Sequence, residues 1–359
     1  MLNFTVGPVM SAKEIREIGG EQIPYFRTPE FSKIMLDNEA LLKEFFKADE
    51  DSRIVFLTAS GTGAMDCAVQ NTLNQNDNVL IVNGGSFGHR FVEICQNYEI
   101  PYTEIICEPG CNITAEQLDK IDGSKYTALL VNVDETSTGV LYDINLLSKF
   151  CKKYNLFFIV DSISSFLCDS FNMKELGVNL VLTGSQKALA LAPGISLICI
   201  DQRAIERVNK AKHVSYYFDI KKYLVNGERG QTPFTPAVGI LLQLNKRLHM
   251  IKDKGGVDAE VAEAAAKAKY FRDHIKDLPF EICSNSLSNA VTPLHPIHEG
   301  VSAHKIFEII KDEYGVYVCP NGGEFKDSIF RIGHIGDLSY DDYDKLIEIF
   351  KDLNKNHRI

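Results

Sequence analysis

The sequence predicts an α/β protein with a mostly parallel sheet, followed by a smaller α+β domain. Short apolar runs alternate with helical patterns over residues 54–200, and strands separated by helices in this way form parallel sheets. The runs are almost continuously apolar, as strands are when helices cover both faces of their sheet. With 359 residues, of which 45% are hydrophobic and 24% charged, the chain is long enough for one large and one smaller domain.

Seven apolar runs give the expected strands of the large domain, namely IVFL (54–57), NVLIVN (78–83), YTEIIC (102–107), YTALLVNV (126–133), LFFIV (156–160), NLVLT (179–183) and ISLICI (195–200). A helix over 255–275 follows a glycine pair, is rich in strong helix formers and is expected to lead into the second domain. Beyond it, short apolar segments and helices over about 303–313 and 340–354 give an α+β pattern. We therefore expect a large domain over 21–254 and a small domain over 255–359.

The charge and the apolar runs exclude several classes of protein. The net charge of −10 comes from 48 acidic and 38 basic residues spread along the chain. Nucleic-acid binding needs clustered Lys and Arg, so no nucleic-acid partner is expected. The longest apolar runs have about six residues, against the roughly 20 that cross a bilayer. No secretory signal is readable at the N-terminus, so we expect no membrane partner and a cytoplasmic location.

Nine cysteines occur without any CxxC spacing, and an odd number in an intracellular chain indicates reduced thiols. Only Cys107 and Cys111 approach a ligand spacing, and without a histidine cluster no metal site is expected. The sequence assigns no function to these two or to Cys319, and most such cysteines fill apolar core.

The candidate functional residues follow the ends of the predicted strands, where parallel sheets bind ligands. Ser60, Gly61 and Thr62 lie between a strand and a helix, so their hydroxyls and free N–H groups form an anion cup. The alternative is a capped helix after a glycine turn. The spacing is not that of a nucleotide triphosphate loop.

Asp161 and Lys187 follow two further strands. A carboxylate directly after a buried strand needs a cationic partner, although helix capping is an equally good interpretation. A lysine at the mouth of a sheet can form a Schiff base, although most lysines are solvated. Together with the anion cup, the two residues match the phosphate, pyridine nitrogen and aldehyde of pyridoxal phosphate.

At these positions the sequence resembles the class V aminotransferases of fold type I, the group that contains alanine–glyoxylate, serine–pyruvate and 2-aminoethylphosphonate–pyruvate transaminases. Nine motifs in the family's order carry the resemblance over nearly the whole chain: TVGPV (5–9), FRTPEF (26–31), ASGTGAM (59–65), NGGSFGHR (83–90), ETSTGV (135–140), DSISS (161–165), GSQKALALAPG (184–194), TPFTPAV (232–238) and FRIGHIG (330–336). The resemblance implies pyridoxal 5′-phosphate as cofactor and a homodimer with shared active sites.

The resemblance also implies roles for single residues. Lys187 is expected to bind the cofactor's aldehyde, Asp161 its pyridine nitrogen, and Phe87 to stack on its ring. Thr136 is expected near the phenolic oxygen. The expected phosphate ligands are Ser60, Gly61, Thr62, Gln186 and, from the neighbouring subunit, Thr235.

For the substrate, the resemblance makes Arg331 the residue that binds the carboxylate, with a surface arginine as the alternative. Gly7 and Pro8 belong to an N-terminal segment, residues 1–20, that is expected to close over the substrate through its backbone. Thr232 stands where some relatives have a second phosphate-binding tyrosine, and its contribution is left open.

The function implied is transfer of an amino group from a small donor, such as alanine, serine or an aspartate-like amino acid, to pyruvate or glyoxylate. The GSQKAL context of the lysine is closer to the alanine–glyoxylate, serine–pyruvate and aspartate-using branches than to the aminoethylphosphonate branch, whose lysine usually follows Asn. The alternatives are a 2-aminoethylphosphonate–pyruvate transaminase, and a lyase, desulfurase or decarboxylase on the same scaffold. A non-enzymatic binding module would not need the lysine, the aspartate and the anion cup together.

Overall fold

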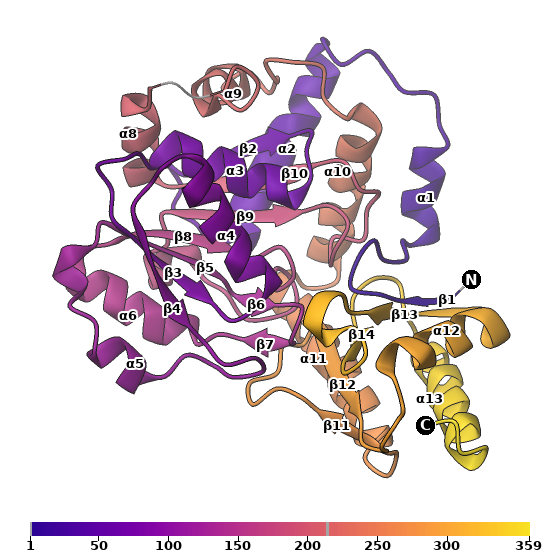
Figure 1. Ribbon diagram of the computed structural model, residues 1–359. Coiled ribbons are helices and arrows are strands. Elements are labelled where there is room, and N and C mark those ends of the chain that lie inside the picture. Colours follow the sequence, from indigo (N-terminus) through magenta and orange to yellow (C-terminus); the bar gives the residue numbers. More distant parts are fainter. Residues whose placement is uncertain (1, 213–214) are drawn as a thin grey trace.

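The computed structural model describes residues 2–212 and 215–359. A seven-stranded sheet forms the centre of its larger part (Figure 1). Its strands, in spatial order, are β2 (Arg53–Leu57), β10 (Ser196–Ile200), β9 (Leu180–Gly184), β8 (Phe157–Asp161), β5 (Ala128–Asn132), β3 (Val79–Asn83) and β4 (Tyr102–Ile106). β10 runs antiparallel to β2 and β9, and the other neighbouring strands pair in parallel. The predicted fold class is confirmed, and each strand begins and ends within two residues of its predicted run.

Helices cover both faces of this sheet, which explains the continuous apolar runs. One face packs against α3 (Gly61–Thr72), α4 (Ser86–Asn97), α8 (Gln202–Lys210) and α9 (Ile220–Gly227), and the other against α2 (Pro29–Phe45), α6 (Ile144–Tyr154) and α10 (Val238–Asp253). In β8, Phe157 and Ile159 enter the first core, whereas Phe158 and Val160 enter the second. The shorter elements are α1 (Lys13–Gly19), α5 (Ala115–Asp119), α7 (Met173–Leu176), the 3-10 turn η1 (Gly123–Lys125) and the ribbon of β6 (Asp134–Glu135) and β7 (Val140–Leu141).

A second sheet begins with the N-terminal strand of the chain, and the C-terminal helix lies beside it (Figure 1). Its spatial order is β1 (Leu2–Phe4), β13 (Val316–Pro320), β14 (Phe330–Gly333), β12 (Val291–Pro296) and β11 (Phe280–Ile282). Around it lie α11 (Val257–His274), α12 (Ala303–Tyr314), α13 (Tyr340–Lys355) and the turn η2 (Gly323–Phe325). The residues that follow β1 contact both parts of the molecule, since Thr5 lies against Gly333 of β14 and Gly7 lies against Lys187, which follows β9.

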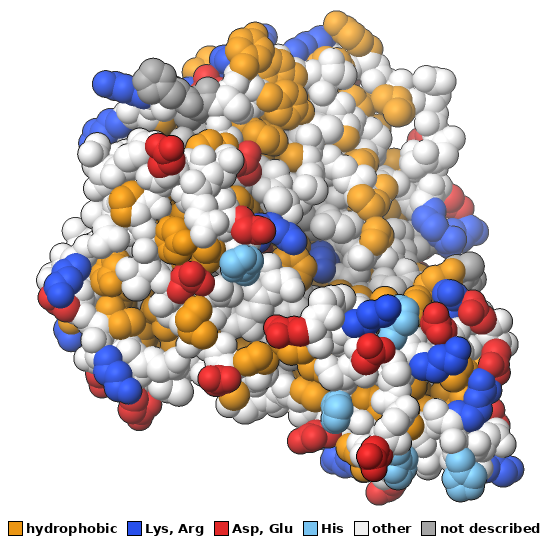
Figure 2. Space-filling model, viewed as in Figure 1, with side chains coloured by type: hydrophobic (Ala, Val, Ile, Leu, Met, Phe, Trp, Pro, Cys, Tyr) orange, Lys and Arg blue, Asp and Glu red, His pale blue; other side chains and the backbone are white. Residues whose placement is uncertain are grey.

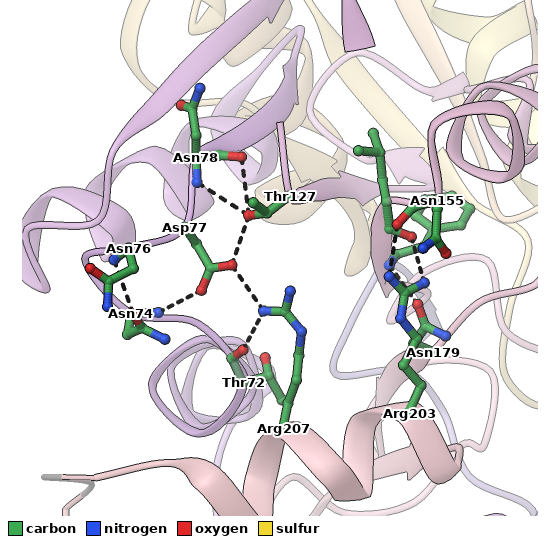
Figure 3. A network of polar contacts seen from close by, with 12 residues as sticks. Thr72, Asn74, Asn76, Asp77, Asn78, Thr127, Asn155, Asn179, Arg203 and Arg207 are labelled. Atoms are coloured by element: carbon green, nitrogen blue, oxygen red, sulfur yellow. Dashed lines mark hydrogen bonds and ion pairs between the residues drawn. The ribbon is translucent and has the colours of Figure 1, made fainter. Parts of the chain in front are cut away.

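The amino ends of the large sheet are fixed by a polar network around α8 (Figure 3). Arg207 Nη1 donates to Asp77 Oδ1 at 3.0 Å, and Thr127 Oγ1 donates to the same oxygen at 2.7 Å. Arg203 donates to the carbonyl oxygens of Asn155 and Leu156 at 2.7 and 3.1 Å. These contacts tie α8 to residues that directly precede β3, β5 and β8. The candidate site lies at the opposite edge of the sheet, where the parallel strands end.

Within residues 2–212 and 215–359, no helix combines the length and the apolar character that crossing a bilayer requires.

Candidate active site

Asp161 and Lys187 both lie at the carboxyl edge of the large sheet. Asp161 is the last residue of β8 and pairs in register with Leu182 of the neighbouring parallel strand β9. Lys187 lies three residues beyond the end of β9. Both side chains are buried, with 4% and 8% of their surface exposed.

The Asp161 carboxylate is buried without a cationic partner. Its Oδ1 accepts a hydrogen bond from the backbone N–H of Ile163 at 2.8 Å. Burial raises the pKa of Asp161 to about 7, and the hydrogen bond and the charge of Lys187 only partly oppose this. Over the described residues, no basic side chain comes within ion-pair distance of Asp161. A carboxylate in this state favours a cation supplied by a ligand.

Lys187 is held against the N-terminal segment. Burial lowers the pKa of Lys187, and an ionised Asp134 would oppose this more strongly than any other neighbouring group. Gly7 packs on the lysine side chain with a φ of +130°, and a Cβ atom there would lie 2.9 Å from Lys187 Cδ. Val9 N–H donates to the carbonyl oxygen of Gln186 at 3.3 Å. Glycine is therefore required at position 7 both by its backbone conformation and by the closeness of the lysine.

The residues of the predicted anion cup lie at the N-terminus of α3. Ser60 is the N-cap, and its Oγ accepts a hydrogen bond from Gly63 N–H at 3.3 Å. Thr62 is exposed, and its Oγ1 accepts a hydrogen bond from Arg90 Nη1 at 3.2 Å. The Arg90 guanidinium also lies 4.9 Å from the ring centroid of Phe87. Arg90 thus adds a full positive charge to the helix N-terminus that the sequence indicates.

A buried glutamate positions Phe87 at the start of α4. Glu135 Oε2 accepts hydrogen bonds from the N–H groups of Phe87 and Gly88 at 3.1 and 3.0 Å, and from Asn132 Nδ2 at 3.0 Å. At Gly88 a Cβ atom would lie 2.6 Å from the carbonyl oxygen of Val82, so the helix can approach the end of β3 this closely only with glycine. The carboxylate at the helix N-terminus fixes the backbone that carries Phe87.

Arg331 joins the small sheet to the site. Its Nη1 donates to the carbonyl oxygen of Thr136 at 3.0 Å and its Nη2 to that of Pro320 at 2.6 Å. The side chain is 92% buried, and Nε has no hydrogen-bond partner among the described residues. Thr136 Oγ1 lies 2.6 Å from Ser164 Oγ, in the turn that follows Asp161. The carbonyl contacts hold the guanidinium in place without neutralising it, so it can still bind an anion.

The loop before α10 carries the other predicted threonines. Thr232 is buried, and its hydroxyl donates to the carbonyl oxygen of Phe234 at 2.7 Å. Thr235 is exposed. Pro8 is also exposed, and its carbonyl oxygen accepts hydrogen bonds from Asn3 Nδ2 and Thr5 Oγ1 at 2.9 and 3.1 Å.

All nine cysteines are free thiols. Burial raises the pKa of Cys107 to about 11, so this thiol is protonated near neutral pH. Cys319 is half-buried and pairs with Arg331 in the register of β13 and β14. In the part of the chain that the structure describes, no three His, Cys, Asp or Glu side chains group as metal ligands.

The family follows from a comparison with known proteins. The model of the class V aminotransferases matches residues 25–323. The chain belongs to this family. It is also 31% identical over 339 residues to an uncharacterised aminotransferase of Methanocaldococcus jannaschii, covering 92% of this chain and 86% of the relative.

Two further proteins are similar to this class V aminotransferase. The L-aspartate–glyoxylate aminotransferase of Paracoccus denitrificans is 27% identical over 345 residues, which cover 94% of this chain and 86% of the relative. The solved structure of an aspartate aminotransferase from Thermus thermophilus matches with a TM-score of 0.91 at 24% identity over 99% of both chains, which shows that the fold is shared.

Sequence reasoning missed two residues at the site of this class V aminotransferase, Glu135 and Arg90. Both lie in motifs that carry the resemblance, ETSTGV and NGGSFGHR. The motifs do not reveal that the Glu135 carboxylate reaches the N-terminus of α4, or that Arg90 reaches across to Thr62 on α3.

Proposed function

We propose that this class V aminotransferase uses pyridoxal 5′-phosphate to move an amino group from a small amino acid, such as alanine, serine or aspartate, to pyruvate or glyoxylate. The observation that carries the proposal is the meeting of a buried lysine and a buried, cation-free carboxylate at one sheet edge. A lysine with a lowered pKa supplies an uncharged amine, and the carboxylate suits a protonated ring nitrogen.

The residues around this pair fit the cofactor. Ser60, Gly61, Thr62 and Gln186 would bind the phosphate, and Arg90 would add a charge beside it. Phe87 would stack on the ring, and Thr136 would lie near the phenolic oxygen. When bound, the cofactor supplies an aldehyde that bonds to amines and a ring that withdraws electrons from the substrate's α-carbon.

The chain's own residues would then perform the proton transfer and the orientation. Lys187, as an uncharged amine, would accept the proton that leaves the substrate's α-carbon and return it to the carbon on the other side of the transferred nitrogen. Asp161 would hold the ring nitrogen protonated, which keeps the ring electron-poor. Gly7 packs on Lys187, and with Pro8 it would exclude water from the reacting atoms.

Arg331 would bind the carboxylate shared by the donor and the acceptor. Its position is fixed by the carbonyl oxygens of Thr136 and Pro320, so the substrate would be oriented against the large sheet. One relative of this chain is an L-aspartate–glyoxylate aminotransferase, which supports a small mono- or dicarboxylate amino acid as donor and a small 2-oxo acid as acceptor.

Arg331→Lys is expected to lower kcat/KM for carboxylate substrates by about two decades. The ammonium group cannot make two parallel bonds to a carboxylate, and losing such a bond costs about 2–3 kcal/mol, at 1.4 kcal/mol for each tenfold. Steady-state kinetics of both half-reactions measure the effect. Visible absorbance of the cofactor bound to Arg331→Lys should be unchanged. The control variant Arg358→Lys should keep wild-type activity, because Arg358 pairs with Glu313 on the surface. Normal rates in both half-reactions would remove Arg331 from the substrate site.

A panel of donors and acceptors tests the proposed reaction. With a true donor and no acceptor, the purified enzyme should convert one equivalent of amino acid per site into its 2-oxo acid and then stop. Addition of pyruvate or glyoxylate should restart turnover. Continued release of product without an acceptor would indicate a lyase, desulfurase or decarboxylase instead.

We further propose that the working unit is a homodimer. Ile23, Tyr25, Tyr216 and Val225 are large apolar or aromatic side chains with 56–76% of their surface exposed. Figure 2 shows hydrophobic side chains gathered at the top of the molecule, beside α9 in Figure 1. An exposed apolar patch of this kind suits a protein partner, and a second copy would bring the exposed Thr235 to its neighbour's phosphate.

Mixing two inactive variants tests the shared site. In a hybrid of Lys187→Ala and Thr235→Asp chains, one site has both defects and the other has neither, so subunit exchange should restore about a quarter of wild-type activity. The matched control mixes Lys187→Ala with Arg331→Ala, whose residues belong to the same chain's site, and should restore none. If Thr235 acts within its own chain, neither mixture gains activity.

A cytoplasmic location completes the proposal. The nine free thiols support it, since disulfides persist in oxidising compartments.

A further inference from the structure

Two buried carboxyl groups lie close to each other, one of them near Lys187, and the proposed reaction uses neither. Asp134 belongs to β6 and Asp169 to the loop after β8, and their exposed fractions are 4% and 5%. Ser288, from the loop between β11 and β12, bridges them. Its Oγ lies 3.1 Å from Asp134 Oδ2 and 2.9 Å from Asp169 Oδ2.

The bridge requires a proton on one of the two carboxyl groups. A serine hydroxyl carries one hydrogen and can donate it to one acceptor. Ser288 Oγ therefore donates to one carboxylate, and the second contact is a hydrogen bond only if the other carboxyl group is protonated and donates to Oγ. Ala290 N–H also donates to Oγ, at 3.0 Å, and supplies no hydrogen bond to either carboxyl group.

The surroundings place the proton on Asp134. Asp169 Oδ1 accepts a hydrogen bond from Asn289 N–H at 3.0 Å, whereas Asp134 Oδ1 is buried and has no partner among the described residues. An ionised carboxylate with an unpartnered oxygen is far more costly to bury than a neutral acid. Burial raises the pKa of Asp134 well above its ordinary value and that of Asp169 to about 6, where the Asn289 and Ser288 bonds lower it.

The charged groups around the pair agree with this assignment. Arg272 of α11 acts on both carboxyl groups and donates to the carbonyl oxygens of Ser288 and Val291. Its charge therefore balances one ionised carboxylate, Asp169. The other titratable groups that act electrostatically on Asp134 are Lys187 and Glu135. Those that act on Lys187 are Asp134, Cys319, Arg331 and Asp161.

We propose that Asp134 is held as a neutral carboxylic acid that donates its proton to Ser288 Oγ, and that Asp134 is a positioning residue which thereby keeps Lys187 an uncharged amine. An ionised Asp134 would instead draw a proton onto the lysine and make it unable to accept one from the substrate. The proposal rests on Lys187 as the reacting lysine of the proposed function.

The test measures the protonation of Lys187 in the cofactor-free chain, so it does not depend on the reaction. Competitive labelling with trace acetic anhydride across pH, followed by mass spectrometry of the Lys187 peptide, gives the pKa of its amine. Asp134→Asn replaces a neutral acid by a neutral amide, and the Lys187 pKa should stay within a few tenths of a unit of wild type. Burial and the negative charge of Asp169 together keep Asp134 protonated, and Asp169→Asn removes that charge and leaves the charge of Arg272 to be balanced by Asp134 instead. Asp134 should then ionise and raise the Lys187 pKa by about one unit.

Two results would overturn the proposal. A fall of about one unit in the Lys187 pKa of Asp134→Asn would show that Asp134 is ionised in the native chain. No change in Asp169→Asn would show that the pair does not act on the lysine. Asp119→Asn, at an exposed position on α5, is the matched control and should leave the Lys187 pKa unchanged.

An infrared measurement keeps the proposal testable if a variant misfolds. At a pH well above the pKa of Asp161, the wild-type chain should retain one protonated carboxyl band, and Asp134→Asn should lose it while Asp119→Asn keeps it. Absence of this band from the wild-type spectrum contradicts the proposal without any variant.

Discussion

Lys187→Ala is expected to lower the rate of transamination by about four decades while the fold remains intact, because in the proposed function the variant loses both the amine that bonds to the cofactor and the group that moves the proton. The side chain packs against Gly7, so its removal leaves a small gap at the surface of the site and not in either core. Steady-state kinetics with a donor identified by the panel measure the loss.

The matched control is Lys246→Ala, which removes an exposed lysine of α10 and should leave the rate unchanged. A second measurement identifies the lysine directly. Borohydride reduction of the cofactor-loaded enzyme, followed by peptide mapping, should place the pyridoxyl label on Lys187. A label on a different lysine, or substantial turnover in Lys187→Ala, would contradict the assignment.

The large sheet could be predicted from sequence because burial on both faces leaves a simple pattern. A run such as LFFIV has no polar position for either face, and β8 is the strand that results, with Phe157 and Phe158 in opposite cores. Once the strands are known to be parallel, Asp161 and Lys187 must lie at the same edge. That edge, with the helix N-terminus at Ser60, is the part of the site that local sequence patterns specify.

Contacts between distant segments leave no such pattern. The pairing of β1 with β13 joins residues more than 300 positions apart. Glu135 caps a helix that begins 49 positions before it in the chain, at Ser86, and Ser288 bridges carboxyl groups 154 and 119 positions away. In each case the residue type occurs in many different environments, and its contacts are determined only when the two sheets pack together.

Asp161→Asn is expected to make the cofactor-free chain more stable above neutral pH and the loaded enzyme much less active. The folded chain holds the pKa of Asp161 at about 7, against about 3.9 for an unperturbed aspartate. With the folded pKa raised, its contribution to the free energy of unfolding is fully present below about pH 4 and is lost as the pH rises through about 7. The loss is about 2–4 kcal/mol by about pH 8, at 1.4 kcal/mol for each unit.

Asparagine has no charge to bury, and its side-chain oxygen can still accept the hydrogen bond from Ile163. Urea unfolding of the two cofactor-free chains should therefore give similar stabilities near about pH 4 and a more stable variant near about pH 8. Asp119→Asn should follow the wild type at both values. Equal differences at the two pH values would mean that the Asp161 carboxylate is not the source of the effect.

Burial of the ionised Asp161 carboxylate should become favourable when the protonated ring nitrogen of the cofactor lies beside it. The attraction between two opposite charges about 4 Å apart at an effective dielectric near 20 is worth about 4 kcal/mol. Asp161→Asn loses this attraction and should lower kcat/KM by about three decades. Pyridoxal 5′-phosphate should accordingly raise the melting temperature of the wild-type chain more than that of Asp161→Asn, because only the wild type exchanges an unpaired buried carboxylate for an ion pair. An equal rise in both chains would show that the ring nitrogen does not meet Asp161, and would leave the raised pKa of that group without a functional partner.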